Sequence, residues 1–170
     1  MIEIKPMLPD QWQLHKSMRC AALANAAYAF SSTLESALKR SDEDWRRITR
    51  QYAGDPNSNT FFAFENEIPC GMSACVIAGN EAEMLAVWVD PACRRKGAGR
   101  ALIEFACNWS RLHGAKQLKV GVFDDNPGAL AFYRSAGFND GGITRPELST
   151  ENRTVLLLTM KLSRTAGREG

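Results

Sequence analysis

The chain has 170 residues, of which 45% are hydrophobic and 24% charged, and its net charge is +2. This length suits one domain with a substantial core, and the small net charge argues against a nucleic-acid-binding protein, which usually has a concentrated basic face. No apolar run approaches membrane length, and the N-terminus does not resemble a signal peptide. Five irregularly spaced cysteines favour reduced thiols over disulfides or zinc. We therefore expect a cytoplasmic protein with no metal, nucleic-acid or membrane partner.

The first third of the chain is expected to hold one strand and three helices. Alternating apolar and polar residues predict a strand at Ile2–Met7. The helices that follow are expected over 9–28, within 29–40 and over 41–52. Ser41 precedes Asp44 by three residues, which resembles a capping box and predicts where the third helix begins.

After residue 59 the pattern favours strands. Three strands separated by hairpin turns are expected over 60–65, 69–78 and 81–90. Beyond them we expect helices over 97–112 and 128–135, and strands over 117–123, 138–144 and 154–162. This order predicts a mixed α/β (α+β) sandwich around one central sheet. One domain is expected over 1–162, followed by a flexible tail at 163–170.

The most informative stretch is 87–100, where an apolar strand leads through a proline into a basic, glycine-containing turn and then into a helix. Backbone N–H groups at a helix start are free to bind an anion, and the helix dipole favours negative charge there. Glycine allows a phosphate to approach the main chain. Three cations strengthen the positive field: Arg94, Arg95 and Lys96. The stretch therefore predicts a pyrophosphate-binding site.

Two well-known phosphate-binding motifs do not fit this stretch. A dinucleotide fingerprint requires a third glycine where this chain has Leu102, and a P-loop requires Gly-Lys-Ser/Thr, which is absent. The chain instead has Arg94-x-x-Gly97-x-Gly99 after a Val-x-Val-x-Pro strand. This pattern resembles the coenzyme A signature of the GNAT N-acetyltransferase superfamily.

A second motif lies in 126–138, after the next expected strand. Asn126 is a typical helix N-cap, and Pro127 suits the first helical position. Tyr133 follows Asn126 by seven residues, about two helical turns, so both side chains can lie on one helix face. Capping alone, and a half-buried tyrosine, are the simpler interpretations. Together with the first motif, the pair strengthens the resemblance to GNAT acetyltransferases over about 81–138.

The resemblance implies a fold and a set of roles. It implies a mostly antiparallel, twisted sheet whose central strands splay apart, with helices on both faces. The strand of Val87, Trp88 and Val89 would pair with the pantetheine arm of acetyl-CoA, and the turn would wrap the pyrophosphate. Asn126 would contact the cofactor, and Tyr133 would lie near the thioester sulfur. The expected coenzyme contacts are Val87, Trp88, Val89, Arg94, Arg95, Lys96, Gly97, Ala98, Gly99, Arg100, Asn126 and Tyr133.

The chemistry expected at such a site is direct attack of an amine on the thioester carbonyl. A backbone N–H at Trp88 or Val89 could stabilise the tetrahedral oxyanion. Tyr133, with a reference pKa of about 10, would stay protonated and donate to the leaving thiolate. Direct transfer needs no covalent intermediate, so Cys93 is not expected to be a nucleophile.

The sequence does not identify a single group that accepts the amine proton. Some relatives that acetylate protein N-termini carry a glutamate where this chain has Gly121. We favour Glu83 as the catalytic base, directly or through water, with Glu81 or water alone as alternatives. Strand alternation would place Glu83 on the same face as Leu85, Val87 and Val89. His15 and His113 are expected to be surface or helix-end residues.

The acceptor is expected to lie over the N-terminal helices and the final hairpin. Phe30, Glu35 and Trp45 are candidates for its lining, and Glu35 would suit a cationic amine. The leading interpretation is an acetyl-CoA-dependent N-acetyltransferase that acts on a primary amine of a small molecule. A protein or peptide N-acetyltransferase and a non-catalytic acyl-CoA-binding module are the alternatives, and a homodimer stays open.

Overall fold

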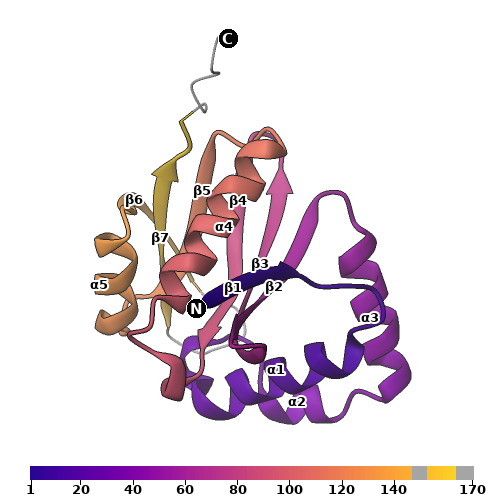
Figure 1. The fold of residues 1–170 in the computed structure, drawn as a ribbon. Coiled ribbons are helices and arrows are strands. Elements are labelled where there is room, and N and C mark those ends of the chain that lie inside the picture. Colours follow the sequence, from indigo (N-terminus) through magenta and orange to yellow (C-terminus); the bar gives the residue numbers. More distant parts are fainter. Residues whose placement is uncertain (147–152, 164–170) are drawn as a thin grey trace, which may run out of the picture.

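One seven-stranded sheet runs through the molecule (Figure 1). The computed structural model describes residues 1–146 and 153–163. The strands follow the spatial order β1-β2-β3-β4-β5-β7-β6, and only β4 and β5 are parallel neighbours. Their bounds are β1 (Ile2–Pro6), β2 (Ser58–Glu65), β3 (Ile68–Ala78), β4 (Glu81–Val89), β5 (Gln117–Phe123), β6 (Asn139–Pro146) and β7 (Thr154–Lys161). The predicted mixed, mostly antiparallel sheet is confirmed.

Helices cover both faces of this sheet, as expected. α4 (Ala98–Leu112) and α5 (Pro127–Ser135) pack on one face, with α4 lying in front of the sheet in Figure 1. α1 (Trp12–Asn25), α2 (Leu34–Leu38) and α3 (Asp42–Gly54) contribute to a second core cluster on the other face. Within the described residues, no helix is both long enough and apolar enough to cross a membrane.

The first two helices are shorter than the sequence predicts. α1 ends at Asn25, because Ala26 leaves the helical conformation, and a 3₁₀ turn then occupies Ala27–Ala29. Phe30 and Thr33 are extended, so the helix expected within 29–40 is confined to Leu34–Leu38, where the Thr33 side chain caps it. Most of the expected tail, residues 164–170, lies outside the described residues.

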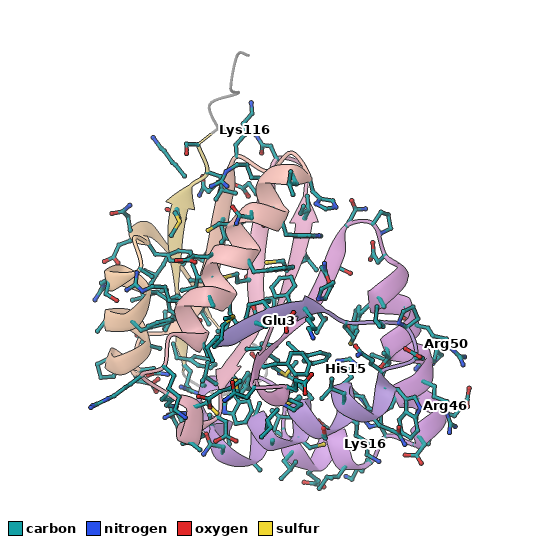
Figure 2. All side chains as sticks on the ribbon, viewed as in Figure 1. Glu3, His15, Lys16, Arg46, Arg50 and Lys116 are labelled. Carbon is teal, nitrogen blue, oxygen red and sulfur yellow. The ribbon has the colours of Figure 1, made fainter. Side chains whose placement is uncertain are left out.

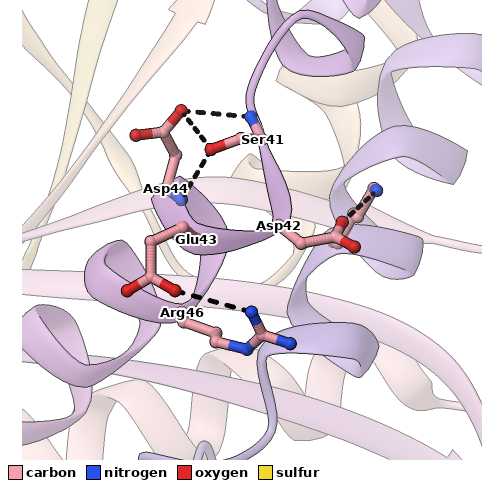
Figure 3. Close-up of polar contacts among 6 residues, drawn as sticks. Ser41, Asp42, Glu43, Asp44 and Arg46 are labelled. Atoms are coloured by element: carbon pink, nitrogen blue, oxygen red, sulfur yellow. Dashed lines mark hydrogen bonds and ion pairs between the residues drawn. The ribbon is translucent and has the colours of Figure 1, made fainter.

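The predicted capping box at the start of α3 is confirmed (Figure 3). The Ser41 hydroxyl accepts from the Asp44 backbone N–H at 3.1 Å, and the Asp44 carboxylate accepts from the Ser41 backbone N–H at 3.0 Å. This reciprocal pair satisfies two amides at the helix end and fixes where α3 begins. The helix then buries Trp45 and Thr49 against the N-terminal side of the core.

The sheet is split at its centre. β4 and β5 pair only from Glu81 with Gln117 to Met84 with Val120. β4 continues to Val89 and β5 to Phe123 without further pairs between them, while β3 still pairs with β4 as far as Val89. The two strands therefore splay apart and leave backbone groups of β4 without a partner strand on that side.

A bulge in β4 lies beside the split. Met72 pairs with Trp88 but Ala74 pairs with Leu85, so one residue of β3 faces two residues of β4. Ala86, one of those two, has φ +52°, which is uncommon for a residue with a side chain. Such a bulge interrupts the alternation of side chains along the strand.

The bulge overturns one expectation about Glu83. Met84 packs in the same core cluster as Val87 and Val89, on the face of α4 and α5. With unbroken alternation, Met84 and Val87 would lie on opposite faces of the sheet. The extra residue of the bulge places them on the same face. Glu83 therefore lies on the face opposite Val87 and Val89, the side of the N-terminal helices.

Candidate functional site

A cleft of about 560 Å³ opens where β4 leaves β5. Its walls come from the end of β4, the turn that follows, and the first turns of α4 and α5. The sequence-predicted residues that line it are Val87, Trp88, Val89, Arg94, Arg95, Gly97, Ala98, Gly99, Arg100, Asn126 and Tyr133. We call this space the coenzyme cleft. Eleven of the twelve residues expected to contact a coenzyme thus meet around one space.

The start of α4 presents free backbone amides to this cleft. Gly97 is the N-cap residue, has φ +90°, and supplies no side chain to cap the helix. The first intrahelical bond of this turn runs from the Ala101 N–H to the Gly97 carbonyl at 2.9 Å. The amides of Ala98, Gly99 and Arg100 thus remain available, and the helix dipole adds partial positive charge. This arrangement suits a phosphate group.

Gly99 has a packing role as well. A Cβ added there would lie 2.9 Å from Cζ of Phe132 on α5. Because real Cβ contacts are not that short, a side chain at this position would require the Phe132 ring to move. The glycine therefore leaves room for the Phe132 ring of α5 beside the first turn of α4, where both residues line the cleft.

The basic side chains do not all serve the cleft. Lys96 does not line it and instead pairs with Glu65 at 2.9 Å, which lowers the pKa of that carboxyl group. Arg94 lines the cleft, but its Nε donates to the Val89 carbonyl at 3.2 Å. Arg95, with φ +63°, and Arg100 form no ion pair with the described residues.

Asn25 belongs to neither of the two sequence motifs. It ends α1, and its side-chain oxygen accepts from the Trp88 indole N–H at 3.1 Å and from Arg94 Nη2 at 3.3 Å. Trp88 is only 6% exposed. Asn25 thus ties the end of α1 to the strand and turn of the cleft, through partners more than sixty residues away in the chain.

The second motif places Asn126 and Tyr133 in the same cleft, as their spacing predicts. The Asn126 oxygen accepts from the Ala129 N–H at 3.2 Å and so caps α5, which leaves its amide nitrogen to donate to a ligand. Tyr133 is 6% exposed, and burial raises the pKa of its hydroxyl. That hydroxyl forms no hydrogen bond with another described residue, so it is a protonated donor without a protein acceptor.

A second cleft, of about 290 Å³, continues through the split from Tyr133 and Val87, which line both spaces. We call it the acceptor cleft. Glu83 and Phe30 line it, together with Gly121 from β5. Because β4 and β5 separate here, Glu83 from one face of the sheet and Tyr133 from the other face line the same space.

Other candidates from the sequence lie elsewhere. Glu81 pairs with Lys119 at 2.7 Å, and Glu35 pairs with Lys39 at 2.7 Å, and neither glutamate lines the acceptor cleft. His15 is buried rather than at the surface, between α1 and α3 (Figure 2), and its Nδ1 lies 2.9 Å from the Thr49 hydroxyl.

All five cysteines are free. Cys93 lines the coenzyme cleft, and its thiol lies 3.5 Å from the Glu65 carboxylate. Cys70 is buried nearby, which raises its thiol pKa to about 11. Neither His15 nor His113 lines the coenzyme cleft, so no His–Cys pair forms there.

A family model described as "Acetyltransferase (GNAT) family" matches residues 24–138. The chain belongs to this family. The matched residues include both halves of the coenzyme cleft, from the end of α1 through the start of α4 to all of α5. The resemblance found in the sequence is therefore confirmed at the level of the family.

Solved structures show the same fold for this GNAT acetyltransferase. Spermidine N-acetyltransferase from Vibrio cholerae, in complex with CoA and spermine, superimposes with a TM-score of 0.78 at 15% identity, over 96% of each chain. The structure of yncA from Salmonella typhimurium with acetyl-CoA gives 0.75 at 15% identity, over 100% of this chain and 99% of that one.

Among curated proteins, the ribosomal protein bS18-alanine N-acetyltransferase of Escherichia coli is 38% identical over 66 residues. That match covers 39% of this chain and 45% of the relative. The chain spans about half the length of the curated relatives it matches. These matches share the acetyltransferase family but differ in the amines that their names specify.

Proposed function

We propose that this chain is an acetyl-CoA-dependent N-acetyltransferase that transfers the acetyl group directly to a primary amine of a small molecule. The main evidence for this proposal is the split between β4 and β5. It brings unpaired backbone of β4, the free amides of α4 and the Tyr133 hydroxyl to one cleft. Structural neighbours that bind CoA or acetyl-CoA support the same cosubstrate here.

The coenzyme fits the cleft in a defined direction. The pyrophosphate would accept from the amides of Ala98, Gly99 and Arg100, with Arg95 and Arg100 as counterions. The pantetheine amides would pair with β4 along Val87–Val89, where the strand lacks a neighbour on the β5 side. The thioester would then lie at Tyr133, where the coenzyme cleft meets the acceptor cleft.

The reaction needs one bond to form and one to break. The amine lone pair attacks the thioester carbonyl, forming the C–N bond, and a backbone N–H of the Val87–Val89 segment stabilises the oxyanion. Collapse of the tetrahedral intermediate breaks the C–S bond, and the thiolate takes a proton from the Tyr133 hydroxyl. Because burial raises the pKa of that hydroxyl, it is protonated at neutral pH before transfer.

Glu83 is the proposed acceptor of the amine proton. It lines the acceptor cleft with Tyr133, on the side of the N-terminal helices where the amine would enter. Glu81 lies outside that cleft in its ion pair with Lys119. The amine proton passes to Glu83, directly or through water, while the Tyr133 proton passes to sulfur. Return of a proton from Glu83 to the Tyr133 oxygen through water then restores both residues and completes the proton balance.

The size of the acceptor cleft, about 290 Å³, favours a small acceptor over a folded protein. The match to the ribosomal protein bS18-alanine N-acetyltransferase keeps a peptide amine as the second candidate acceptor. A non-catalytic acyl-CoA-binding module would not need a protonated donor at the junction of the two clefts. The free thiols accord with a reducing compartment such as the cytoplasm, which we propose as its location.

The experiment is a measurement of free thiol released from acetyl-CoA with a panel of amines, amino acids and short peptides, with products identified by mass. We expect amine-dependent release by one or more small amines. Release only with peptides would replace the small-molecule assignment. Tight CoA binding without release by any member would contradict the enzyme assignment.

A further inference from the structure

A third pocket, of about 290 Å³, lies beside the acceptor cleft and carries two arginines. We call it the arginine pocket. It lies between α1, α3 and the strands β2, β3 and β4, and it is lined by Arg19 and Arg40 together with His15, Trp45 and Tyr52. Among the lining residues predicted from the sequence, Glu35 is the one that would suit a cationic amine. Glu35 lines neither this pocket nor the acceptor cleft.

Arg19 holds an uncompensated charge in this pocket. Its Nη1 atom is buried without a hydrogen-bond partner, and its guanidinium lies 5.0 Å from the centre of the Phe30 ring. Neither Arg19 nor Arg40 forms an ion pair with an Asp or Glu of the described residues. Arg19 is half-buried, and a partly buried charge without a counterion is disfavoured, so an arrangement of this kind favours binding of an anion.

The other groups that face Arg19 do not neutralise it. Arg40 lies over the Trp45 ring at 5.2 Å and adds a second positive charge. Burial lowers the pKa of Arg19, and the charge of Arg40 lowers it further. Burial and the two arginines lower the pKa of His15 to about 4, so the imidazole is uncharged at neutral pH. The Tyr52 hydroxyl and the Cys75 thiol also line the pocket, and burial raises the pKa of Cys75 to about 12, so this thiol is uncharged at neutral pH. The pocket therefore carries net positive charge.

The arginine pocket is continuous with the acceptor cleft. Arg19, Ser32, Leu85 and Ala86 line both spaces. Val87, the next residue after Ala86, lines both the acceptor cleft and the coenzyme cleft. The acceptor cleft thus meets the coenzyme cleft at Val87 and joins the arginine pocket at Leu85 and Ala86.

We propose that the acceptor is an amine that also carries a carboxylate, such as an amino acid, with its carboxylate held by Arg19 and Arg40. The amine then points through the acceptor cleft toward Tyr133 and Glu83. Guanidinium groups match carboxylates geometrically and can bind them through two parallel hydrogen bonds. This inference rests on the proposed function and specifies its substrate class.

The test compares acceptors that differ only in the charged group. Amino acids are paired with their amides and with the corresponding decarboxylated amines, and thiol release from acetyl-CoA is measured for each. We expect kcat/KM to be at least about tenfold higher for the acid than for its amide, the ratio expected from one charge-assisted hydrogen bond. Equal rates for acid and amide would overturn the inference while leaving the proposed function intact.

Two variants locate the effect. Arg19→Gln and Arg40→Gln should each raise KM for the acid about tenfold and leave KM for the amide unchanged. Arg40 is exposed, so its substitution tests the inference even if Arg19→Gln does not fold. Arg50→Gln, on the outward side of α3 (Figure 2), is the matched control and should change neither value. Equal changes for acid and amide would indicate a merely structural role and overturn the inference.

A binding measurement separates this inference from the proposed function. With CoA bound, amino acids at millimolar concentration should raise Tm more than their amides do, and Arg40→Gln should remove the difference. If no amine is acetylated yet the Tm difference holds, the proposed function fails and the anion site stands. If acids and amides shift Tm equally, the anion site fails.

Discussion

The Asn25 side chain accepts a hydrogen bond from the Trp88 indole at 3.1 Å and so joins the last residue of α1 to the strand of the coenzyme cleft. Arg94 donates to the same oxygen at 3.3 Å. A residue outside both sequence motifs therefore holds the wall of the site in place. It also couples the N-terminal helices, which frame the acceptor cleft and the arginine pocket, to the coenzyme cleft.

Asn25→Ala should destabilise the chain by about 1–3 kcal/mol, because it leaves a buried indole N–H without an acceptor. It should also weaken CoA binding, because Arg94 loses one of its two anchors. Urea unfolding and CoA titration measure the two effects. Asn108→Ala, which removes an acceptor of Arg111 on the surface of α4, is the control and should change both by little. Equal behaviour of the two variants would contradict the structural role of Asn25.

Tyr133→Phe should lower kcat about 100-fold or more and leave CoA affinity nearly unchanged. The substitution removes only the hydroxyl, which forms no hydrogen bond with another described residue, so the packing of the ring against Phe138 and Phe132 should persist. Steady-state kinetics and CoA titration give the two quantities. An unchanged kcat would remove the tyrosine from the mechanism.

Glu83→Gln should lower kcat about 100-fold or more, since the amine loses its proton acceptor. Glu81→Gln is the matched control on the same strand, and its ion pair with Lys119 lies outside the acceptor cleft. Glu81→Gln should change kcat by no more than about twofold relative to the parent chain, because it removes only a surface ion pair. Equal losses in the two variants would count against Glu83 as the base.

Arg95→Ala should weaken CoA binding about tenfold, whereas Lys96→Ala should change it by little. The sequence predicts both residues as coenzyme contacts. In the structure only Arg95 lines the cleft, whereas Lys96 pairs with Glu65. Titration of CoA at two salt concentrations measures both affinities. A larger loss for Lys96→Ala would mean that this ion pair opens when the coenzyme binds.

His15 should make the chain less stable in mild acid. Its pKa is about 4 in the folded chain and 6.5 in the unfolded chain, because burial and the charges of Arg19 and Arg40 disfavour the imidazolium. The unfolded state therefore takes up a proton first, and the stability present above pH 6.5 falls by up to about 3 kcal/mol as the pH drops to 4. Unfolding of His15→Gln at several pH values should show a flatter dependence than that of the parent chain, and an equally steep fall in both would contradict this role of His15.

The sequence predicted the order of the elements because each has a local signal. The capping box of Ser41 and Asp44 and the glycine turn at Gly97 act within a few residues, and their consequences can be derived from spacing alone. The grouping of Asn126 and Tyr133 on one cleft also follows from helical geometry.

The remaining features depend on contacts between distant segments. The bulge at Ala86 arises from the register of β3 against β4, and it reverses the expected face of Glu83. Lys96 leaves the cleft because Glu65 ends the neighbouring strand β2. Arg19 and Arg40 meet only when α1 and the segment before α3 pack against β4. No pattern within one segment could have indicated these juxtapositions.

A crystal structure of the chain with acetyl-CoA and no acceptor would test whether the coenzyme binds along β4 and at the start of α4. We expect the pyrophosphate within hydrogen-bond distance of the amides of Ala98, Gly99 and Arg100, the pantetheine arm paired with Val87–Val89, and the sulfur beside the Tyr133 hydroxyl. A coenzyme bound with its pyrophosphate away from the start of α4, or with its thioester away from Tyr133, would contradict this expectation.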